Sequence, residues 1–324
     1  MRFIFFLTYI LCKIVPSYII TSDDFFISKH IQSQNFIQAQ SQSLDFQMVK
    51  YLAEMSFDAY LVINSSNWYS FNNVSDISID RSTVKGYIFQ INDQFVVSIK
   101  GTSILFDTIN FQNDRFNDNL FFSCCYYKQS NLYNGLHNKC DINTPEHTCS
   151  QSCYLESAQF DLNYMNILDK IGSNLERLID LNKVIFTGHS LGGFLATYMA
   201  IKYNRPAITF ETPGTKRYLD LIGLNYTNAS KSIYHFGHNA DPIFMGRCNS
   251  RSSLCYIGGY ILRTKCHVGK TCTYDSQGKL NISESILTHR MDYILKNIIQ
   301  FWETDFPECI EASACTDCEQ WSVI

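Results

Sequence analysis

Residues 183–200 read KVIFTGHSLGGFLATYMA, an apolar run followed by a glycine-rich turn and a second apolar run. The first run predicts a buried strand and the second predicts a helix. Between them, Gly188 and Gly192 flank Ser190 in a G-x-S-x-G motif, and these glycines permit a turn too sharp for larger side chains. The strand and helix context favours a nucleophile elbow over a structural glycine-rich turn. We therefore predict that the hydroxyl of Ser190 is presented as a nucleophile at the positive end of a helix.

A serine hydroxyl attacks a carbonyl carbon when a base removes its proton, and histidine is the usual base near neutral pH. In hydrolases with this elbow, the acid and then the histidine follow the serine along the chain. The histidines that follow the motif are His235, His238, His267 and His289. His289 is favoured because it lies in a loop just before a predicted helix, whereas His267 adjoins Cys266 in an expected disulfide loop. His189 is adjacent to Ser190, so we expect its side chain to diverge and pack beside the elbow.

The candidate acid is Asp241, which follows a predicted strand at residues 232–236 and precedes Pro242. This position is beyond the carboxyl end of a strand, where such enzymes hold the carboxylate that orients the histidine. Asp220 and Asp275 are alternatives, and an Asp-Pro pair is equally typical of an ordinary turn.

Acyl transfer also needs two N–H donors where the oxyanion develops. One candidate is the backbone N–H of Leu191, directly after Ser190. The other is Thr102, because Gly101 and Thr102 follow a predicted strand at residues 94–100. Without the elbow, the same residues would be interpreted as an ordinary strand-ending turn.

The remaining pattern predicts a single α/β domain. Apolar residues at helical spacing predict helices at residues 44–60, 155–181 (with a kink at Gly172) and 287–301. Further strands are predicted at residues 85–92 and 94–100, around a turn at Asn92 and Asp93, and at residues 207–210 and 232–236. We place the domain at residues 21–302, with a Cys-rich polar insertion at residues 123–153 and a Cys-containing tail at residues 303–324.

Residues 104–122 mix bulky apolar side chains with Asp and Asn. We expect an irregular or short amphipathic segment that covers the core rather than joining it. Its apolar side chains nearest the expected oxyanion loop are Ile104, Leu105, Phe106, Ile109 and Phe111.

Composition excludes some classes of protein. Hydrophobic residues make up 46% of the chain and charged residues 17%, which excludes global disorder. The net charge is −4 and no cluster of Lys and Arg occurs, so we expect no nucleic-acid partner.

Several features point to the secretory pathway. Residues 1–20 carry an early positive charge and an apolar run interrupted by Lys13, which favours a signal peptide cleaved near Ser17 over an uncleaved signal anchor. Cleavage would leave twelve of the thirteen cysteines, and an oxidising compartment would pair them. Zinc binding is disfavoured, because Cys315 and Cys318 lack a second pair at finger spacing. The N-x-[ST] sequons, which are candidate glycosylation sites, lie at Asn64, Asn73, Asn225, Asn228 and Asn281.

Together, the motifs resemble the class 3 (fungal-type) lipases over residues 85–321. The resemblance is carried by IKGT at 99–102, GHSLGG at 188–193, FETPG at 210–214, the acid near 241 and the histidine at 289. Other strings are similar to the autophagy-related vacuolar phospholipases that lyse autophagic and multivesicular bodies. These are NDNLFFSCC at 117–125, GHNADPIFMG at 237–246, IGGY at 257–260, KCHVGK at 265–270, THR at 288–290 and CTDCEQW at 315–321.

The resemblance implies an α/β-hydrolase fold of the class 3 lipase type, with Ser190 as nucleophile, Asp241 as acid and His289 as base. It implies hydrolysis of ester bonds in membrane phospholipids or triacylglycerols through an acyl-enzyme, without a metal or organic cofactor or an obligate protein partner. The implied location is a vacuolar, lysosomal or multivesicular-body lumen, or the exterior of the cell. A lid would follow the oxyanion loop, at the apolar side chains of residues 104–111, with a permanently packed loop as the alternative. Family members commonly carry an N-terminal membrane anchor, whereas Lys13 breaks the apolar segment here.

Two other functions remain alternatives. A soluble esterase or peptidase could use the same three residues, although the apolar covering segment disfavours it. A non-catalytic lipid-binding glycoprotein with a relic elbow would be expected to have lost a catalytic residue, and the sequence retains all three.

Overall fold

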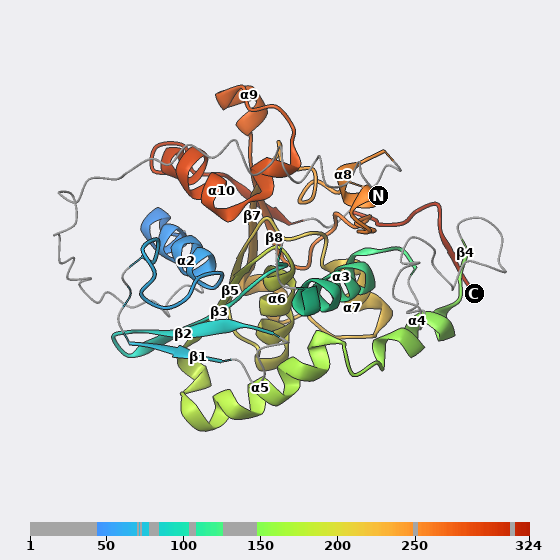
Figure 1. Cartoon of the computed structure of the whole chain (residues 1–324), viewed down its shortest axis with the longest axis horizontal. Coiled ribbons are helices and arrows are strands. Elements are labelled where there is room, and N and C mark those ends of the chain that lie inside the picture. Colours follow the sequence, from blue (N-terminus) through green and yellow to red (C-terminus); the bar gives the residue numbers. More distant parts are fainter. Residues whose placement is uncertain are drawn as a thin grey trace. The chain divides into compact units, whose positions relative to one another are not determined.

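The computed structural model describes residues 44–69, 71, 73–77, 84–103, 108–125, 148–248, 252–311 and 315–324. The expected signal segment at residues 1–20 lies outside these ranges. The main sheet has its described strands in the order β1-β2-β3-β5-β6-β7-β8-β9 (Figure 1). Their bounds are β1 Val74–Asp76, β2 Gly86–Ile91, β3 Gln94–Ile99, β5 Val184–His189, β6 Ala207–Phe210, β7 Ile233–His238, β8 Lys270–Tyr274 and β9 Cys309–Glu311.

The centre of the sheet is parallel and its two edges are antiparallel. Strands β3, β5, β6, β7 and β8 run parallel, so their carboxyl ends meet at one edge of the sheet. Strands β1 and β2 add antiparallel pairs on one side, and β9 adds one on the other. A separate parallel pair joins β4 (Thr148–Cys149) to β10 (Ser322–Val323). Ligand sites of open α/β sheets form at the edge where parallel strands end.

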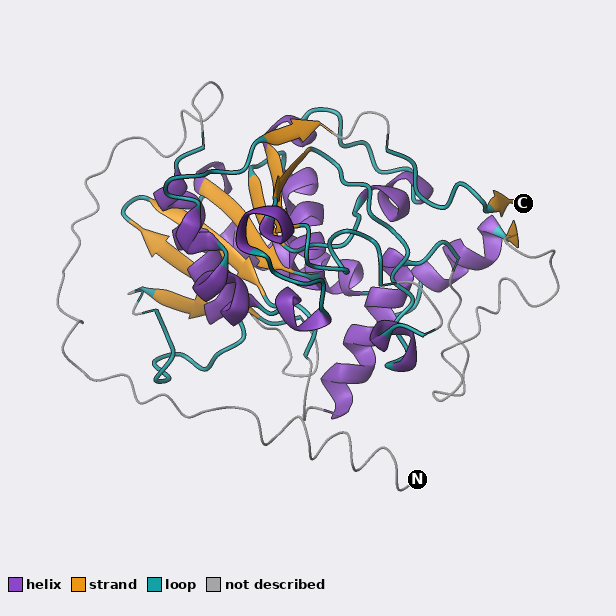
Figure 2. Ribbon diagram, turned by 90° about the horizontal axis from the view of Figure 1, so that it is seen from above, coloured by secondary structure: helices purple, strands orange, loops and turns teal. Residues whose placement is uncertain are grey.

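Helices cover both faces of the sheet (Figure 2). Helices α2 (Phe46–Asp58) and α10 (Met291–Asn297) contribute to one core, and α3 (Thr108–Phe122), α5 (Tyr164–Leu178), α6 (Leu191–Tyr203) and α7 (Lys216–Leu221) contribute to the other. Strand β5 serves both cores, because successive side chains point to opposite faces. Val184 and Phe186 lie in the core beneath α6, and Ile185 lies in the core beneath α2. The predicted α/β class is therefore confirmed.

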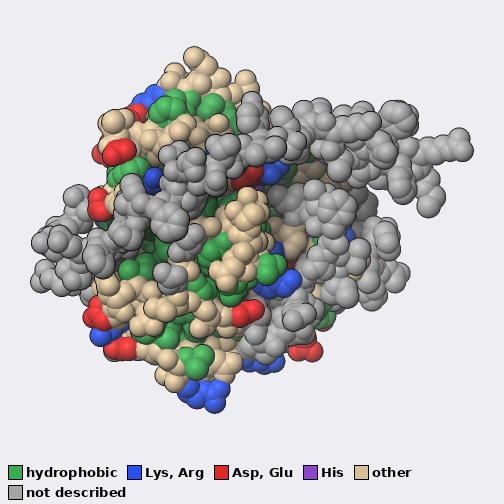
Figure 3. All heavy atoms as spheres, turned by 60° about the vertical axis from the view of Figure 1, so that its left-hand side comes forward, with side chains coloured by type: hydrophobic (Ala, Val, Ile, Leu, Met, Phe, Trp, Pro, Cys, Tyr) green, Lys and Arg blue, Asp and Glu red, His purple; other side chains and the backbone are tan. Residues whose placement is uncertain are grey.

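The shorter helices lie in the connections. They are α4 (Gln151–Ala158), α8 (Leu254–Ile257) and α9 (Ser276–Leu280), with 3-10 turns η2 (Leu181–Lys183), η3 (Ala229–Ser232), η4 (Ile286–His289) and η5 (Ile299–Phe301). On the face shown in Figure 3, acidic and basic side chains are interspersed with apolar ones. None of the described helices combines the length and apolar character that crossing a membrane requires.

The predicted helix at residues 155–181 is two helices, α4 and α5. Gly172, the predicted kink, lies buried inside α5, and the interruption of the predicted helix falls before α5 instead. Asn163 causes the break, because its side chain accepts the N–H of Met165 over 3.0 Å and donates to the carbonyl of Ala158 over 2.7 Å. An asparagine that satisfies backbone groups in this way begins a new helix.

The expected C-terminal helix at residues 287–301 is also divided, into η4, α10 and η5. Arg290 is extended, with φ −71° and ψ 135°, and it separates η4 from α10. Ser285 caps η4 by accepting the N–H of Leu287 over 3.2 Å. Apolar spacing alone does not reveal these interruptions, because they depend on local side-chain and backbone geometry.

The expectation that residues 104–122 only cover the core was wrong for their second part. Residues 104–107 lie outside the described ranges, and helix α3 begins at Thr108. Phe116, Leu120, Phe121 and Phe122 are buried in the core beneath α6. Phe121 stacks on Phe194 of α6 with ring centroids 4.3 Å apart. Only the beginning of the segment remains a candidate cover.

Disulfides connect the C-terminal tail to the domain. Cys124–Cys318 and Cys266–Cys315 hold the last residues, and Cys272–Cys309 joins β8 to β9. Two further bridges are Cys125–Cys149 and Cys248–Cys255. Bridges between residues far apart in sequence stabilise the fold chiefly by restricting the unfolded chain. The expectation of extensive cysteine pairing is therefore confirmed among these residues.

The turn from β5 into α6 leaves no room for side chains on two of its glycines. A Cβ on Gly192 would overlap the backbone carbonyl oxygen of Ile99 and lie 2.7 Å from the carbonyl carbon of Lys100. A Cβ on Gly188 would lie 2.6 Å from the carbonyl carbon of Gly192. The beginning of α6 therefore packs directly on the backbone that leaves β3.

We predict that Gly192→Ala destabilises the protein by about 1–3 kcal/mol, the usual cost of overpacking, because rigid backbone rather than a flexible side chain fills the space. Urea unfolding measures this cost. Gly258→Ala is the matched control, since its added Cβ would meet no atom closer than 3.2 Å and Gly258 has an ordinary φ of −74°. Equal unfolding midpoints for the two variants would contradict the prediction.

Candidate active site

The three residues expected to carry out catalysis lie beyond the carboxyl ends of the central strands. Ser190 directly follows β5, and Asp241 lies three residues after β7. His289 ends the turn η4, which comes after β8 and α9. These residues are 48 to 99 positions apart in sequence, and the shared edge of the parallel strands brings them together.

A continuous hydrogen-bonded path joins the three side chains. His289 Nδ1 lies 2.7 Å from Asp241 Oδ2, and His289 Nε2 lies 2.9 Å from Ser190 Oγ. The carboxylate assigns the ring proton to Nδ1, so Nε2 accepts from the serine hydroxyl. Ser190 and His289 are 7% and 5% exposed, whereas Asp241 is fully buried. The arrangement can move a proton from the serine to a histidine whose positive charge a carboxylate stabilises.

Hydrogen bonds stabilise the buried charge of Asp241. Burial by itself would raise the pKa of this carboxyl, but the charge and hydrogen bond of His289, together with Glu211 and His238, hold the pKa below its ordinary value. The N–H of Ile243 also donates to Asp241 Oδ1 over 2.8 Å. Asp241 is therefore ionised beside His289.

The elbow holds Ser190 in an unusual backbone conformation. Its φ is 56° and its ψ is −126°, a region that residues other than glycine rarely adopt. The N–H of Ser190 donates to the carbonyl of Phe210 over 3.0 Å, which fixes the turn to the end of β6. Leu191 is the first residue of α6, and the first N–H groups of a helix have no acceptor within the helix. Its N–H is therefore suited to bind an oxyanion.

Acidic side chains of α3 fix the loop that holds Thr102. The hydroxyl of Thr102 donates to Asp118 Oδ2 over 2.7 Å, and the N–H of Ser103 donates to Asp114 Oδ2 over 2.7 Å. Lys100 Nζ donates to the carbonyl of Gly101 over 3.0 Å. The loop is therefore bound to α3, and the Thr102 hydroxyl is directed towards Asp118.

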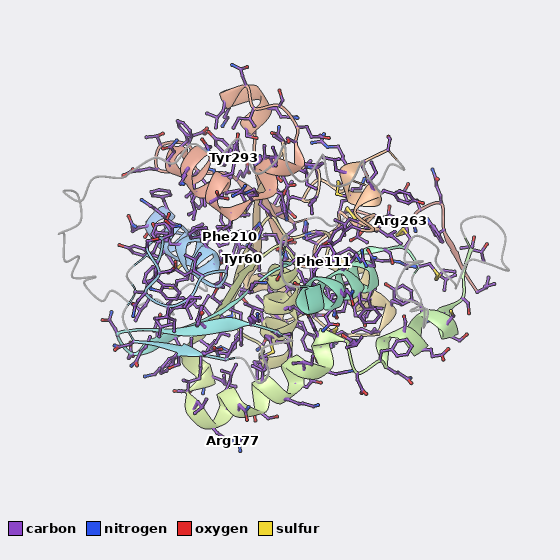
Figure 4. All side chains as sticks on the ribbon, viewed as in Figure 1. Tyr60, Phe111, Arg177, Phe210, Arg263 and Tyr293 are labelled. Carbon is purple, nitrogen blue, oxygen red and sulfur yellow. A yellow bond between two sulfur atoms is a disulfide. The ribbon has the colours of Figure 1, made fainter. Side chains whose placement is uncertain are left out.

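His189 contacts the catalytic histidine through the backbone. Its Nε2 donates to the carbonyl of His289 over 2.8 Å, so its Nδ1 accepts from the hydroxyl of Tyr60 over 2.7 Å. Burial, followed by the charge of His289, lowers the pKa of His189 to about 3 and keeps the ring neutral. Tyr60 reaches this position from the end of α2 (Figure 4). His189 thus packs beside the elbow, as the sequence predicts.

The other candidate acids and bases have partners other than Ser190. Asp220 is paired with Lys216 at the surface, and Asp275 caps α9 by accepting the N–H of Gly278 over 2.9 Å. The rings of His235 and His267 stack on each other, with centroids 4.5 Å apart. His238 Nδ1 lies 2.8 Å from Ser276 Oγ, and Nε2 lies 3.2 Å from the carbonyl of Thr288. Of the candidate bases, His289 is therefore the one that lies within hydrogen-bond distance of Ser190.

Only part of the candidate lid can be placed. Ile104, Leu105 and Phe106 lie outside the described residues, and the backbone of Ile109 lies in α3. Phe111, which is labelled on α3 in Figure 4, contacts Tyr260 edge to face, with ring centroids 6.2 Å apart. The asparagines of all five sequons are exposed, as glycosylation requires: Asn64, Asn73, Asn225, Asn228 and Asn281.

Several residues of the site were not singled out by sequence reasoning. Tyr60, Asp114 and Asp118 act through contacts between distant segments, and sequence spacing carries no signal for such contacts. Glu211 belongs to the FETPG string that carries the family resemblance, although sequence reasoning gave it no role. Among the described residues, no group of three or more His, Cys, Asp and Glu is arranged to hold a metal ion.

Comparison with solved structures finds lipases at low similarity. An extracellular lipase, LipA from Serratia marcescens, is 14% identical with a TM-score of 0.35, over 69% of this chain and 34% of that one. A mutant form of MDLA from Penicillium cyclopium is 16% identical with a TM-score of 0.34, over 70% of this chain and 77% of that one.

Comparison of sequences finds closer relatives. The model of the Tle-like phospholipase domain matches residues 133–228. The protein named "Putative lipase ATG15" from Eremothecium gossypii is 35% identical over 303 residues, which cover 86% of this chain and 55% of that protein. The protein of the same name from Saccharomyces cerevisiae is 33% identical over 84% of this chain and 55% of its own length. The chain spans about half the length of these curated relatives. Over that shared length, the chain belongs to the family of the ATG15 lipases, which confirms the resemblance in its motifs.

Proposed function

We propose that this chain is a serine carboxylic-ester hydrolase of the lipase type, with Ser190 as nucleophile, His289 as base and Asp241 as the orienting carboxylate. The observation that carries the proposal is the unbroken hydrogen-bond path from Ser190 Oγ through His289 to Asp241. The conformation of Ser190 supports it, because a positive φ at a serine between a strand and a helix is typical of a nucleophile elbow.

In the proposed acylation step, Ser190 Oγ attacks the ester carbonyl carbon while His289 Nε2 takes the hydroxyl proton. The oxyanion accepts hydrogen bonds from the backbone N–H groups of Leu191 and Thr102. When the tetrahedral intermediate collapses, the bond to the alcohol oxygen breaks and His289 donates its proton to that oxygen. The acyl group remains on Ser190 as an ester.

Deacylation repeats the sequence with water. His289 Nε2 takes a proton from the water, whose oxygen attacks the acyl carbon. Collapse then releases the carboxylic acid and returns the proton to Ser190 Oγ. Asp241 stabilises the imidazolium of His289 in both steps without itself accepting the proton.

We propose that the substrate is a lipid in a membrane or aggregate, either a phospholipid or a triacylglycerol. The names of the relatives and the phospholipase-like domain support a lipid. Leu287, two residues before His289, is 55% exposed, and Ile257 in α8 is 69% exposed. Apolar side chains in such positions are suited to contact lipid. The candidate lid at residues 104–111 would cover the acyl site until it meets a lipid surface.

We further propose that the protein acts in the lumen of a vacuole, lysosome or multivesicular body, on the membranes of autophagic or multivesicular bodies. Extensive disulfide pairing is typical of proteins that fold in an oxidising compartment. The exposed sequons are compatible with glycosylation there. As part of the same proposal, residues 1–20 are a signal peptide that is cleaved near Ser17.

We predict that Ser190→Ala lowers ester hydrolysis by roughly 10⁴-fold or more, because the variant lacks the hydroxyl that would form the acyl intermediate. A fluorophosphonate should label the wild-type protein on a single peptide that contains Ser190, and the variant should not be labelled. Peptide mass mapping and hydrolysis of a lipid ester measure the two effects.

Ser173→Ala is the matched control, since Ser173 is exposed on α5 and should be hydrolytically silent. Labelling on any peptide without Ser190 would overturn the assignment of the nucleophile.

We also predict that hydrolysis accelerates when a short-chain ester passes from monomers to micelles.

Leu287→Asp should lower the rate on vesicles or micelles by roughly 10-fold, the effect of removing one apolar side chain from a lipid contact. The same variant should leave the rate on monomers unchanged. Leu178→Asp is the control, because Leu178 is 70% exposed at the end of α5. A wild-type rate that is the same on monomers and aggregates would favour a soluble esterase.

A further inference from the structure

Glu211 is a buried acidic residue to which the proposed mechanism assigns no role. It directly follows β6, is 1% exposed and has a φ of 46°, in the left-handed region that is costly for a residue other than glycine. Its N–H donates to the carbonyl of Phe236 over 2.8 Å. The preceding residue, Phe210, accepts the N–H of Ser190. The same chain segment therefore holds both the elbow and the Glu211 carboxyl.

The Glu211 carboxyl lies against that of Asp241. The two carboxyls lie close enough to share a side-chain hydrogen bond, and Glu211 Oε2 accepts the N–H of His238 over 3.3 Å. Glu211 Oε1 is buried and has no hydrogen-bond partner among the described donors, so a proton shared with Asp241 would supply its missing hydrogen bond. The titratable groups that surround this pair are His238, whose Nε2 lies 3.8 Å from Glu211 Oε1, His289, and His189, on which the charge of Asp241 also acts. Two carboxylates buried this close repel each other strongly, so the pair retains one proton.

The surroundings decide which carboxyl holds that proton. Asp241 accepts from His289 Nδ1 and from the N–H of Ile243, which favours its charged form. Burial raises the pKa of Glu211 well above its usual range, and the charge of Asp241 raises it further. Burial lowers the pKa of His238, which disfavours a positive charge on its ring beside Glu211. The proton therefore resides on Glu211.

We propose that Glu211 is a positioning residue, which as a neutral acid donates a hydrogen bond to the Asp241 carboxylate and keeps it ionised and directed at His289. The inference rests on the proposed function of Ser190, His289 and Asp241, and adds a fourth side chain to that path. Glu211 does not contact the substrate. It acts by preventing Asp241 from taking up a proton as the pH falls, which would leave His289 without an oriented partner.

The test compares Glu211→Gln, whose amide can still donate to Asp241 and accept from His238, with Glu211→Leu, which can do neither. The rate at which a fluorophosphonate labels Ser190 reports activation of the nucleophile without any lipid. We expect Glu211→Gln to label within about threefold of the wild-type rate, and Glu211→Leu to label roughly 10- to 100-fold more slowly, as expected for one lost hydrogen bond to a charged group.

The pH profile separates this role from a purely structural one. Loss of the donor raises the pKa of Asp241, so the acid limb of kcat/KM should move to higher pH in Glu211→Leu and stay in place in Glu211→Gln. General loosening of the fold would lower the rate at every pH without moving that limb. Thermal unfolding establishes that each variant is folded, and if Glu211→Leu does not fold, the Gln variant decides alone.

A 10-fold or greater loss in folded Glu211→Gln would overturn the proposal, because it would mean that the site needs an ionised carboxylate there. An unchanged acid limb in folded Glu211→Leu would overturn it as well. Asp317→Asn is the control: this carboxyl also has a pKa raised by burial, but it binds the N–H groups of Lys265 and Cys266 away from the path. Absence of labelling at Ser190 in the wild-type protein would instead contradict the proposed function.

Discussion

The hydrogen bond between His289 Nδ1 and Asp241 Oδ2, 2.7 Å long, sets the strictest requirement on the architecture. A buried carboxylate is tolerated only when donors surround it, so β7, η4 and the end of β6 must meet at one point. The hydroxyl of Thr288 helps to fix η4 by donating to the carbonyl of Ala240 over 2.9 Å. The turn that carries the histidine is therefore attached directly to the loop that carries the acid.

The elbow adds a second requirement, which concerns backbone rather than charge. Gly188 and Gly192 allow α6 to begin against the end of β3, and that contact places Leu191 near the loop of Thr102. Ser190 adopts a strained φ of 56°, and the hydrogen bond from its N–H to the carbonyl of Phe210 helps to hold that conformation. The contact between β3 and α6 thus brings together the two candidate parts of the oxyanion site.

Around this centre, neutral groups with fixed partners surround the few charges. His189 is neutral and donates to the carbonyl of His289, and His238 holds Glu211 through its backbone N–H. Each contact limits how far His289 or Asp241 can move. A site arranged in this way needs little reorganisation when charge develops during acyl transfer. The disulfides that attach the tail to β8 and to the residues just after α3 stabilise the outer part of the same scaffold.

Much of the fold and the candidate site follows from sequence, because their signals are local. The apolar run of β5, the glycines of the elbow and the turn at Asn92 are each encoded within a few residues. Chain order and loop position pointed to His289 and Asp241, which the structure places within hydrogen-bond distance. The break at Asn163 and the extended Arg290 were missed, because each depends on hydrogen bonds or backbone angles that apolar spacing does not record.

By itself, the sequence determined the order of strand, turn and helix around Ser190 and the small set of residues that could complete its site. The tertiary structure alone decided which of them meet. It paired Tyr60 with His189, Asp118 with Thr102 and Glu211 with Asp241, although each pair is separated in sequence by 16 to 129 residues. The physical reason is that burial and hydrogen bonding depend on distance in space, which a sequence pattern with a period of a few residues does not specify.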